Sequence, residues 1–359
     1  MRGTFVDQGG LFSYIAPEAR VPMNHPLRKI RKLVRDVLDE LNRSLSRLYA
    51  SEGRPSIPPE QLLSALLLQV FYGIRSERQL MEQLDYNLLY RWFVGVSPDD
   101  LVWDPTVFTK NRDRLQSGEV FAKFMTKLLN HPQVKPLLSD EHFSVDGTLI
   151  EAWASQKSFR PKDGSGDDDG GANFHGQKRK NDTHASMTDP DCRLYRKAAG
   201  REAKLCYLGH VTMENRHGLA VAGKVTHANG TAERWASETM LKARRKAAGR
   251  RITAGEDKAY DTAEHVAKLR ALNVTPHVTQ FNSASPRGRQ SAIDGRTTRH
   301  QGYGISQSCR AMTECIFGWG KQHGTMRKTK HRGIARVAAD FLLNLIAYNL
   351  IRIPKLVAA

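Results

Sequence analysis

Three acidic residues far apart in the sequence have the side-chain type and the setting to hold a divalent metal ion. Glu314 is isolated among positive charges, because the stretch from Ser285 to Ala338 contains eleven Lys or Arg residues and only two acids. A carboxylate can hold a divalent cation against a phosphate. The alternative is an ion pair with Arg310 one helical turn away, which contributes roughly a few tenths of a kcal/mol. Glu314 alone does not decide between the two.

Asp146 and Asp257 each follow a short segment with the two-residue alternation of a β-strand. Asp146 is expected to end the strand 142–146, and Gly147 leaves room beside it for a phosphate. The alternative for Asp146 is an ordinary turn residue at a strand end. Asp257 follows the strand expected at 252–255. Carboxylates at strand ends are held rigidly, and converging ones bind hard divalent cations.

The segment GEDKAYDT around Asp257 contains three acids, and the pattern favours one of them. Strand alternation directs Glu256 and Asp257 to opposite sides, so both cannot reach one metal ion. Asp261 is expected to cap the helix that follows it. Asp257 is therefore the candidate ligand, and the neighbouring Lys258 is a candidate phosphate contact.

Glu314 is expected on a helix that begins near Ser306. On an ideal helix, the polar residues of this segment fall within an arc of about 60°. They are Gln307, Arg310, Glu314 and Lys321. The apolar residues are expected to form the buried side. They are Ala311, Met312, Cys315, Ile316 and Trp319. The exposed face would then present an acid between cations that grip phosphates.

The elements that must position these residues fall into two groups. After an arm at 1–26, apolar residues at helical spacing predict helices at 27–50, from Pro59, from Ser76 through Phe93, from Asp104 and at 120–129. They predict a small all-α domain at 27–135, which fits a helix-turn-helix or a plain helical bundle equally well.

The second group is a mixed α/β domain at 141–353. Besides the strands named above, strands are expected at 207–211, 219–225 and 274–278, and helices at 232–248 and 262–272. The segment 337–353 is too short and polar to span a bilayer and is expected to be a core helix. A flexible Gly/Asp-rich insertion is expected at about 157–205. Its basic run of Lys178, Arg179 and Lys180 either contacts a phosphate backbone or solvates the loop.

Composition favours a nucleic-acid partner. The 359 residues include 55 Lys or Arg against 37 Asp or Glu, for a net charge of +18. Ribosome-associated and membrane-surface proteins can carry similar charge, so other motifs must decide. The sequence has no HExxH, GxSxG or P-loop motif, and its four cysteines form no CxxC pair. Reduced thiols and the lack of a secretory signal at the start of the sequence are typical of the cytoplasm.

The spacing Arg310-x3-Glu314-x6-Lys321 resembles the Tyr-x2-Arg-x3-Glu-x6-Lys signature of bacterial insertion-sequence transposases with a DDE active site, of the insertion-sequence-five type. Further resemblance lies in FSVDGTLIEAWAS, NDTHASMTDPDCRLYRK, GEDKAYDT and FLLNLIAYNLIRIPKL, and in the helical segment 54–95. Together these cover most of residues 30 to 356. One position departs from the signature, because Gln307 replaces the tyrosine. Glutamine can hydrogen-bond a phosphate or base but offers no stacking surface.

The resemblance implies a ribonuclease-H-like catalytic domain, with a mixed sheet flanked by helices. In it, Asp146, Asp257 and Glu314 would hold two Mg²⁺ ions, with Mn²⁺ able to substitute, while Arg310 and Lys321 would contact phosphates. The enzyme would cut double-stranded DNA at terminal inverted repeats and join the freed 3′-hydroxyl to target DNA. It would act as a homodimer or larger assembly, in the bacterial cytoplasm with the nucleoid and without a membrane partner.

Two other functions remain open from the sequence. The first is a DNA-binding protein without catalysis, either a regulator that uses the N-terminal helices or a decayed transposase. The second is a ribonuclease or repair nuclease on the same fold, which would cut without joining ends. The presence of all three acids argues against decay.

Overall fold

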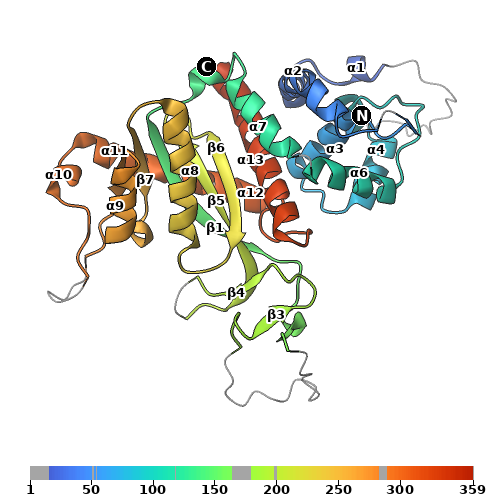
Figure 1. The fold of residues 1–359 in the computed structure, drawn as a ribbon. Helices are drawn as coiled ribbons and strands as arrows, with labels where there is room; N and C mark the ends of the chain where they lie inside the picture. Colours follow the sequence, from blue (N-terminus) through green and yellow to red (C-terminus); the bar gives the residue numbers. More distant parts are fainter. Residues whose placement is uncertain are drawn as a thin grey trace, which may run out of the picture.

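The computed structural model describes residues 16–50, 52–53, 55–117, 119–163, 179–197, 200–282 and 289–358. A mixed β-sheet lies among helices, and a separate group of helices from the first part of the chain lies to one side of it (Figure 1). The long helix α13 (Ile334–Val357) runs between the two groups. The predicted fold class, a mixed α/β domain preceded by a helical region, is confirmed.

The helical region follows the predicted pattern, with one break that was not predicted. Ser76 caps its helix by accepting a hydrogen bond from the Gln79 amide, as expected. The single helix expected through Phe93 is instead two, because the Asn87 side chain accepts from the Leu89 and Tyr90 amides and starts a new helix. The helices are α1 (Pro17–Arg20), α2 (Pro26–Ser46), α3 (Pro59–Phe71), α4 (Glu77–Tyr86), α5 (Leu88–Val94), α6 (Pro105–Ser117) and α7 (Val120–Asn130).

The expected arm at 1–26 is partly folded. Residues 1–15 lie outside the described part of the chain. Beyond them, α1 leads into Val21, which is buried, and Arg28 donates hydrogen bonds to the carbonyls of Glu18 and Val21. Residues 16–26 thereby pack against α2, and within them only the short helix α1 departs from the irregular backbone that was expected.

The main sheet contains three antiparallel and two parallel pairs of neighbouring strands, so it is a mixed sheet, as predicted. β1 (His142–Glu151) lies centrally, with β5 (Lys204–Glu214) antiparallel on one side and β7 (Ile252–Glu256) parallel on the other. β8 (Val274–Val278) extends the parallel side. β6 (Ala220–His227) and β4 (Arg193–Tyr195) pair antiparallel with successive parts of β5.

β1 continues well past the point predicted for its end. It pairs with β5 as far as Glu151, so Asp146 lies within the strand and not at its terminus. Its pairing with β7 ends at Ser144, opposite Gly255. On that side, the described residues give β1 no further strand partner until a single bridge joins Glu151 to Lys328. We call residues 146–150 of this side the open edge of β1.

Helices cover both faces of the sheet. Figure 1 shows α8 (Ala232–Ala248) in front of the strands and α12 (Met312–Gln322) and α13 behind them. The bounds predicted for α8 are confirmed. α9 (Ala263–Ala271), α10 (Gly295–Thr298) and α11 (Gln301–Arg310) complete the layers. Short 3-10 turns lie at Lys135–Leu137, Gln156–Ser158 and Lys258–Tyr260.

α13 is a core helix, as its sequence predicts. Its length and composition would suffice to cross a membrane, but here most of it is buried between β6, α12 and the N-terminal helices. Gly209 and Gly223 allow α13 to lie close to the sheet, because a side chain at either position would collide with Phe341 or Leu345. Buried Asn349 donates to the Ala220 carbonyl at 2.8 Å, which ties the helix to the sheet.

Buried charges join the N-terminal helices to the rest of the molecule. Glu77 of α4 forms ion pairs with Arg112 and, at 3.7 Å, with Lys330, and all three side chains are largely removed from solvent. Lys330 also donates to Gln69 at 3.0 Å, and burial lowers its pKa to about 8. Asp340 of α13 lies close enough to offset part of that burial effect. This group of side chains fixes α4 and α6 against the segment that precedes α13.

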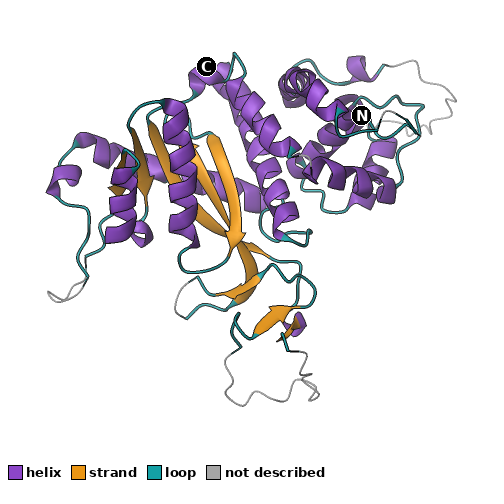
Figure 2. Ribbon diagram, in the orientation of Figure 1, coloured by secondary structure: helices purple, strands orange, loops and turns teal. Residues whose placement is uncertain are grey.

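Much of the insertion expected to be flexible is folded. β2 (Phe159–Pro161) pairs with β3 (His184–Ser186) in a small projection, seen below the main sheet in Figure 2. β4 joins the main sheet. Asp189, which is fully buried, accepts from the Tyr207 hydroxyl at 2.7 Å and from the Gly333 amide at 3.1 Å. A buried carboxylate with several donors fixes its segment. Residues 164–178 and 198–199 lie outside the described part.

Candidate active site

Asp146 and Asp257 come together where β7 ends. Ser144 lies opposite Gly255 at the last step of the parallel ladder, so Asp146 and Asp257 each lie two residues beyond that step, near enough for the Asp257 charge to act on Asp146. Alternation turns both toward α11, because a side chain at Gly255 would meet the Ser306 carbonyl at 3.2 Å. Burial and the Asp257 charge raise the pKa of Asp146 to about 6, while the Gly147 amide, Arg310 and Lys197 act in the opposite direction.

The choice of Asp257 among three neighbouring acids fits the geometry. Glu256 is fully buried on the opposite face and hydrogen-bonds Ser237 and, at 2.9 Å, His265. Asp257 is half-buried and accepts from the Ala259 amide at 2.7 Å, which holds its side chain at the start of the following turn. Lys258 follows and is exposed.

Asp261 does not cap α9, contrary to the sequence-based expectation. The Thr262 side chain takes that role by accepting from the His265 amide. Asp261 is buried and accepts instead from the amides of Phe281, at 2.7 Å, and Ala292, at 3.1 Å. A carboxylate satisfies loop amides where no backbone acceptor is near, so Asp261 has a structural role and is not a free ligand.

The helix expected to carry Glu314 is divided in two. The Ala311 amide bonds to the Ser308 carbonyl, a three-residue step that tightens the winding between α11 and α12. The buried side of α12 consists of Thr313, Ile316, Phe317 and Gly320. The predicted buried side was therefore wrong in part: Ile316 is buried, but Ala311 and Cys315 are exposed. Glu314 lies exposed in the first turn of α12.

Arg310 and Lys321 are cations without a counter-ion. Within the described residues neither forms an ion pair, and the buried Nε of Arg310 has no hydrogen-bond partner. Lys321 is half-buried; burial and the charge of Lys197 lower its pKa, and Asp146 partly offsets this. Positive charge held near Asp146 without a protein partner is suited to an anionic ligand.

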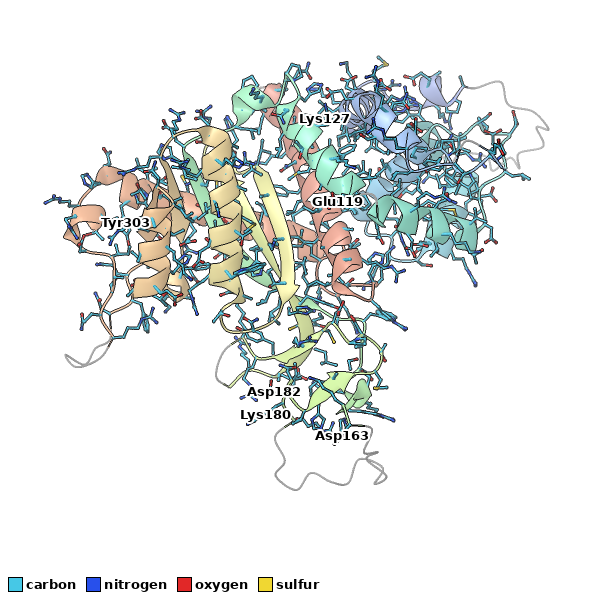
Figure 3. The ribbon with its side chains drawn as sticks, viewed as in Figure 1. Glu119, Lys127, Asp163, Lys180, Asp182 and Tyr303 are labelled. Atoms are coloured by element: carbon cyan, nitrogen blue, oxygen red, sulfur yellow. The ribbon has the colours of Figure 1, made fainter. Side chains whose placement is uncertain are left out.

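Gln307 is turned toward the sheet and not toward an open surface. Its side-chain oxygen accepts from the Thr279 hydroxyl at 2.6 Å and its amide nitrogen donates to the His277 carbonyl. Gln307 was expected on the same exposed helix face as Arg310, and this expectation was wrong. Both ends of its side-chain amide instead hold α11 against the end of β8. Tyr303, labelled in Figure 3, likewise donates to the Val278 carbonyl at 3.0 Å.

The basic run of the insertion is only partly described. Lys178 lies outside the described residues, whereas Arg179 and Lys180 are exposed. Figure 3 shows Lys180 beside Asp182 at the projection formed by β2 and β3. Their contact with DNA stays a prediction.

Two residues near the aspartates were missed by the sequence-based reasoning. Glu233, in the first turn of α8, is half-buried; burial raises its pKa, and so do the charges of Asp257 and Asp146. Its Oε1 lies 3.0 Å from the position that a Cβ would take at Gly147. Lys197 was assigned to the flexible insertion, yet its charge acts on Asp146 and Lys321. An acid in the first turn of a helix is common, so no sequence signal marked Glu233.

The raised pKa of Asp146 predicts a pH-dependent loss of stability. Between about pH 4 and 6 the folded protein retains a proton that the unfolded chain has lost, so stability falls as pH rises through this interval. Above about pH 6 the free energy of unfolding has fallen by the full amount, which is up to about 3 kcal/mol. Asp146→Asn should therefore unfold at a higher urea concentration than the wild type at pH 8, with little difference at pH 3.5. Equal urea midpoints at both pH values would contradict this prediction.

Two protein-family models match the chain. One is described as Transposase domain (DUF772) and matches residues 16–114, and the other as Transposase DDE domain and matches residues 268–354. A search of curated proteins finds no match. Among solved structures, a piggyBac transposase synaptic complex with hairpin DNA is similar at 9% identity and a TM-score of 0.42, covering 92% of this chain and 75% of that one. A Mos1 transposase paired-end complex with the left transposon end has 13% identity, a TM-score of 0.21 and coverage of 86% and 81%.

Proposed function

Because the chain belongs to the transposases with a DDE catalytic domain, we propose that it cuts phosphodiester bonds at the ends of an insertion sequence and joins the freed 3′-hydroxyl to target DNA. The reaction centre is Asp146 and Asp257, at the end of β7. One observation carries the proposal. The two carboxylates lie near Arg310 and Lys321, two cations that form no ion pair among the described residues.

The donor set at the end of β7 fits a divalent cation. Asp146 is desolvated and adjacent to a second carboxylate, an arrangement that disfavours its charged form unless a cation offsets it. Oxygen donors of this kind suit Mg²⁺ or Mn²⁺. No group of three or more acidic, histidine or cysteine side chains in the described ranges is arranged to hold a metal ion. We therefore propose Asp146 and Asp257 as the principal ligands, with Glu314 completing the site when α12 adjusts on binding DNA.

A bound divalent ion would supply Lewis acidity at the scissile phosphate, and two ions would serve both the attacking and the leaving oxygen. The protein's own side chains orient the DNA. Arg310 offers a planar set of donors to phosphate oxygens, and Lys321 adds a point charge beside it. The Arg310 Nε itself is buried without a hydrogen-bond partner among the described residues, so the terminal nitrogens of the guanidinium would make the phosphate contacts. Lys258, exposed next to Asp257, adds a further phosphate contact.

The narrower features follow from the resemblance and remain part of the proposal. They are membership of the insertion-sequence-five type, use of two Mg²⁺ ions, binding to terminal inverted repeats, and a dimer or larger assembly on DNA. An assembly is expected because two DNA ends must be processed together. We place the protein in the bacterial cytoplasm, associated with the nucleoid when it is bound to DNA.

Divalent-ion dependence tests the proposal directly. Purified protein incubated with duplex DNA that carries the element's ends should nick and transfer strands with Mg²⁺ or Mn²⁺, and EDTA should abolish both reactions. DNA binding in a gel-shift assay should persist in EDTA, because phosphate contacts from lysine and arginine do not need the metal. Specific binding without nicking in either metal would instead support a catalytically inactive regulator. Nicking without strand transfer would identify a nuclease.

A further inference from the structure

A large cavity lies along the open edge of β1, between that strand and α12. Its volume is about 1060 Å³, at the upper end of ordinary ligand sites. Lys321 and Lys197 line it, and the charges of both act on Asp146, so the cavity lies near that aspartate. β7 ends before this point, so nothing in the described sheet covers β1 here.

The floor of the cavity is apolar. Leu149 and Tyr195 are half-buried there and pack against Cys206, which is buried. Gly318 of α12 forms part of the opposite wall, and a Cβ at that position would have no neighbour within 4 Å. The cavity therefore offers an apolar surface that includes an aromatic ring, with free space at the Gly318 side.

The rim of the cavity is positively charged. Lys204 is neutralised by Glu151 at 2.6 Å. The remaining cations of the lining form no ion pair within the described residues. They are Lys197, Arg201, Lys321 and Arg327. The acids of the lining are Glu151 and Glu202. An apolar floor under an unneutralised cationic rim matches a ligand with flat rings and phosphates.

We propose that this cavity holds unpaired nucleotides of the DNA end beside the bond that is cut, with bases against Leu149 and Tyr195 and phosphates against Arg201 and Arg327. A duplex keeps its bases stacked inside, so only a strand released from pairing can fill an apolar floor of this kind. The inference rests on the proposed function for its substrate class, DNA. It adds a binding site that does not depend on the reaction.

Binding of short single strands tests this site without catalysis. Fluorescently labelled eight-residue oligothymidine should bind the full-length protein in EDTA, measured by anisotropy, and a strand with the same phosphates but abasic sugars should bind at least about tenfold more weakly. Gly318→Trp fills the free space and should weaken oligothymidine binding by about tenfold, with duplex binding unchanged. Gly304→Trp is the matched control, because Gly304 is also a helical glycine with no neighbour within 4 Å.

Arg201→Ala gives a second test that leaves the helix untouched. It should weaken binding of both single strands, whereas Gly318→Trp affects only the strand that carries bases. Equal binding of thymidine and abasic strands, or equal binding by Gly318→Trp and Gly304→Trp, would overturn the proposal. These outcomes are separate from a failure of the proposed function, which would appear as missing cleavage with metal whatever the strands bind.

Discussion

Asp146→Asn and Asp257→Asn are each expected to reduce DNA cleavage by at least about a thousandfold, equivalent to ~4 kcal/mol of transition-state stabilisation. Each change removes one anionic oxygen donor from the pair at the end of β7 and leaves the side-chain size unchanged. Because neither change touches Arg310 or Lys321, DNA binding should be retained. Single-turnover cleavage with Mn²⁺ and a gel shift on the same DNA measure the two effects separately.

Asp39→Asn is the matched control, because Asp39 is an exposed acid on α2, outside the site. Wild-type cleavage by either active-site variant would remove that aspartate from the reaction. The same assay decides which helix supplies the third acid. Glu314→Gln should match the aspartate variants, whereas Glu233→Gln should retain most activity. The reverse result would assign the third ligand to α8 and would contradict the role proposed for Glu314.

Glu77→Ala is expected to lower the free energy of unfolding by about 3 kcal/mol or more, although Glu77 belongs to the N-terminal helices. Its removal would leave Arg112 and Lys330 as buried cations without their shared carboxylate. Breaking a buried ion pair by deleting one partner costs about 3 to 5 kcal/mol. Urea unfolding followed by circular dichroism measures the change.

The control on the same helix is Glu82→Ala, since Glu82 is exposed and should matter by less than about 1 kcal/mol. Adding Lys330→Met to Glu77→Ala should recover part of the lost free energy of unfolding, because it removes one of the two buried cations that had paired with Glu77. If Glu77→Ala and Glu82→Ala unfold at the same urea concentration, the buried charge group does not hold the N-terminal helices in place.

The sequence predicted elements well where periodicity was long and uninterrupted. α8 and β8 have the predicted bounds, since a strong apolar pattern and a glycine or a strand partner define their ends. Predictions failed where one hydrogen bond changed the backbone. Asn87 divides one expected helix by capping a new one, and the Ala311 step divides the helix that carries Glu314. No residue-level periodicity contains such information.

The candidate site was predictable in part for a similar reason. Strand alternation was enough to prefer Asp257 over Glu256, and the motif spacing indicated Arg310 and Lys321. Asp146 was placed at a strand end because its pattern stops there, but pairing with β5 continues the strand to Glu151. Gln307 lies on the predicted helical face yet bonds to Thr279, and only tertiary structure supplies that partner. Glu233 could not be predicted as a site residue, because only the packing of α8 over Gly147 brings it to the site.

The open edge of β1 also bears on solubility. An unpaired strand edge can recruit a strand from another molecule and so begin aggregation, and proteins commonly guard such edges with charges that point inward. Asp146 stands on this edge, with Lys197 and Lys321 near it. These charges would be buried without solvent if a foreign strand paired there. The groups that we propose to bind a metal ion and a phosphate would therefore also disfavour strand pairing between molecules at this edge.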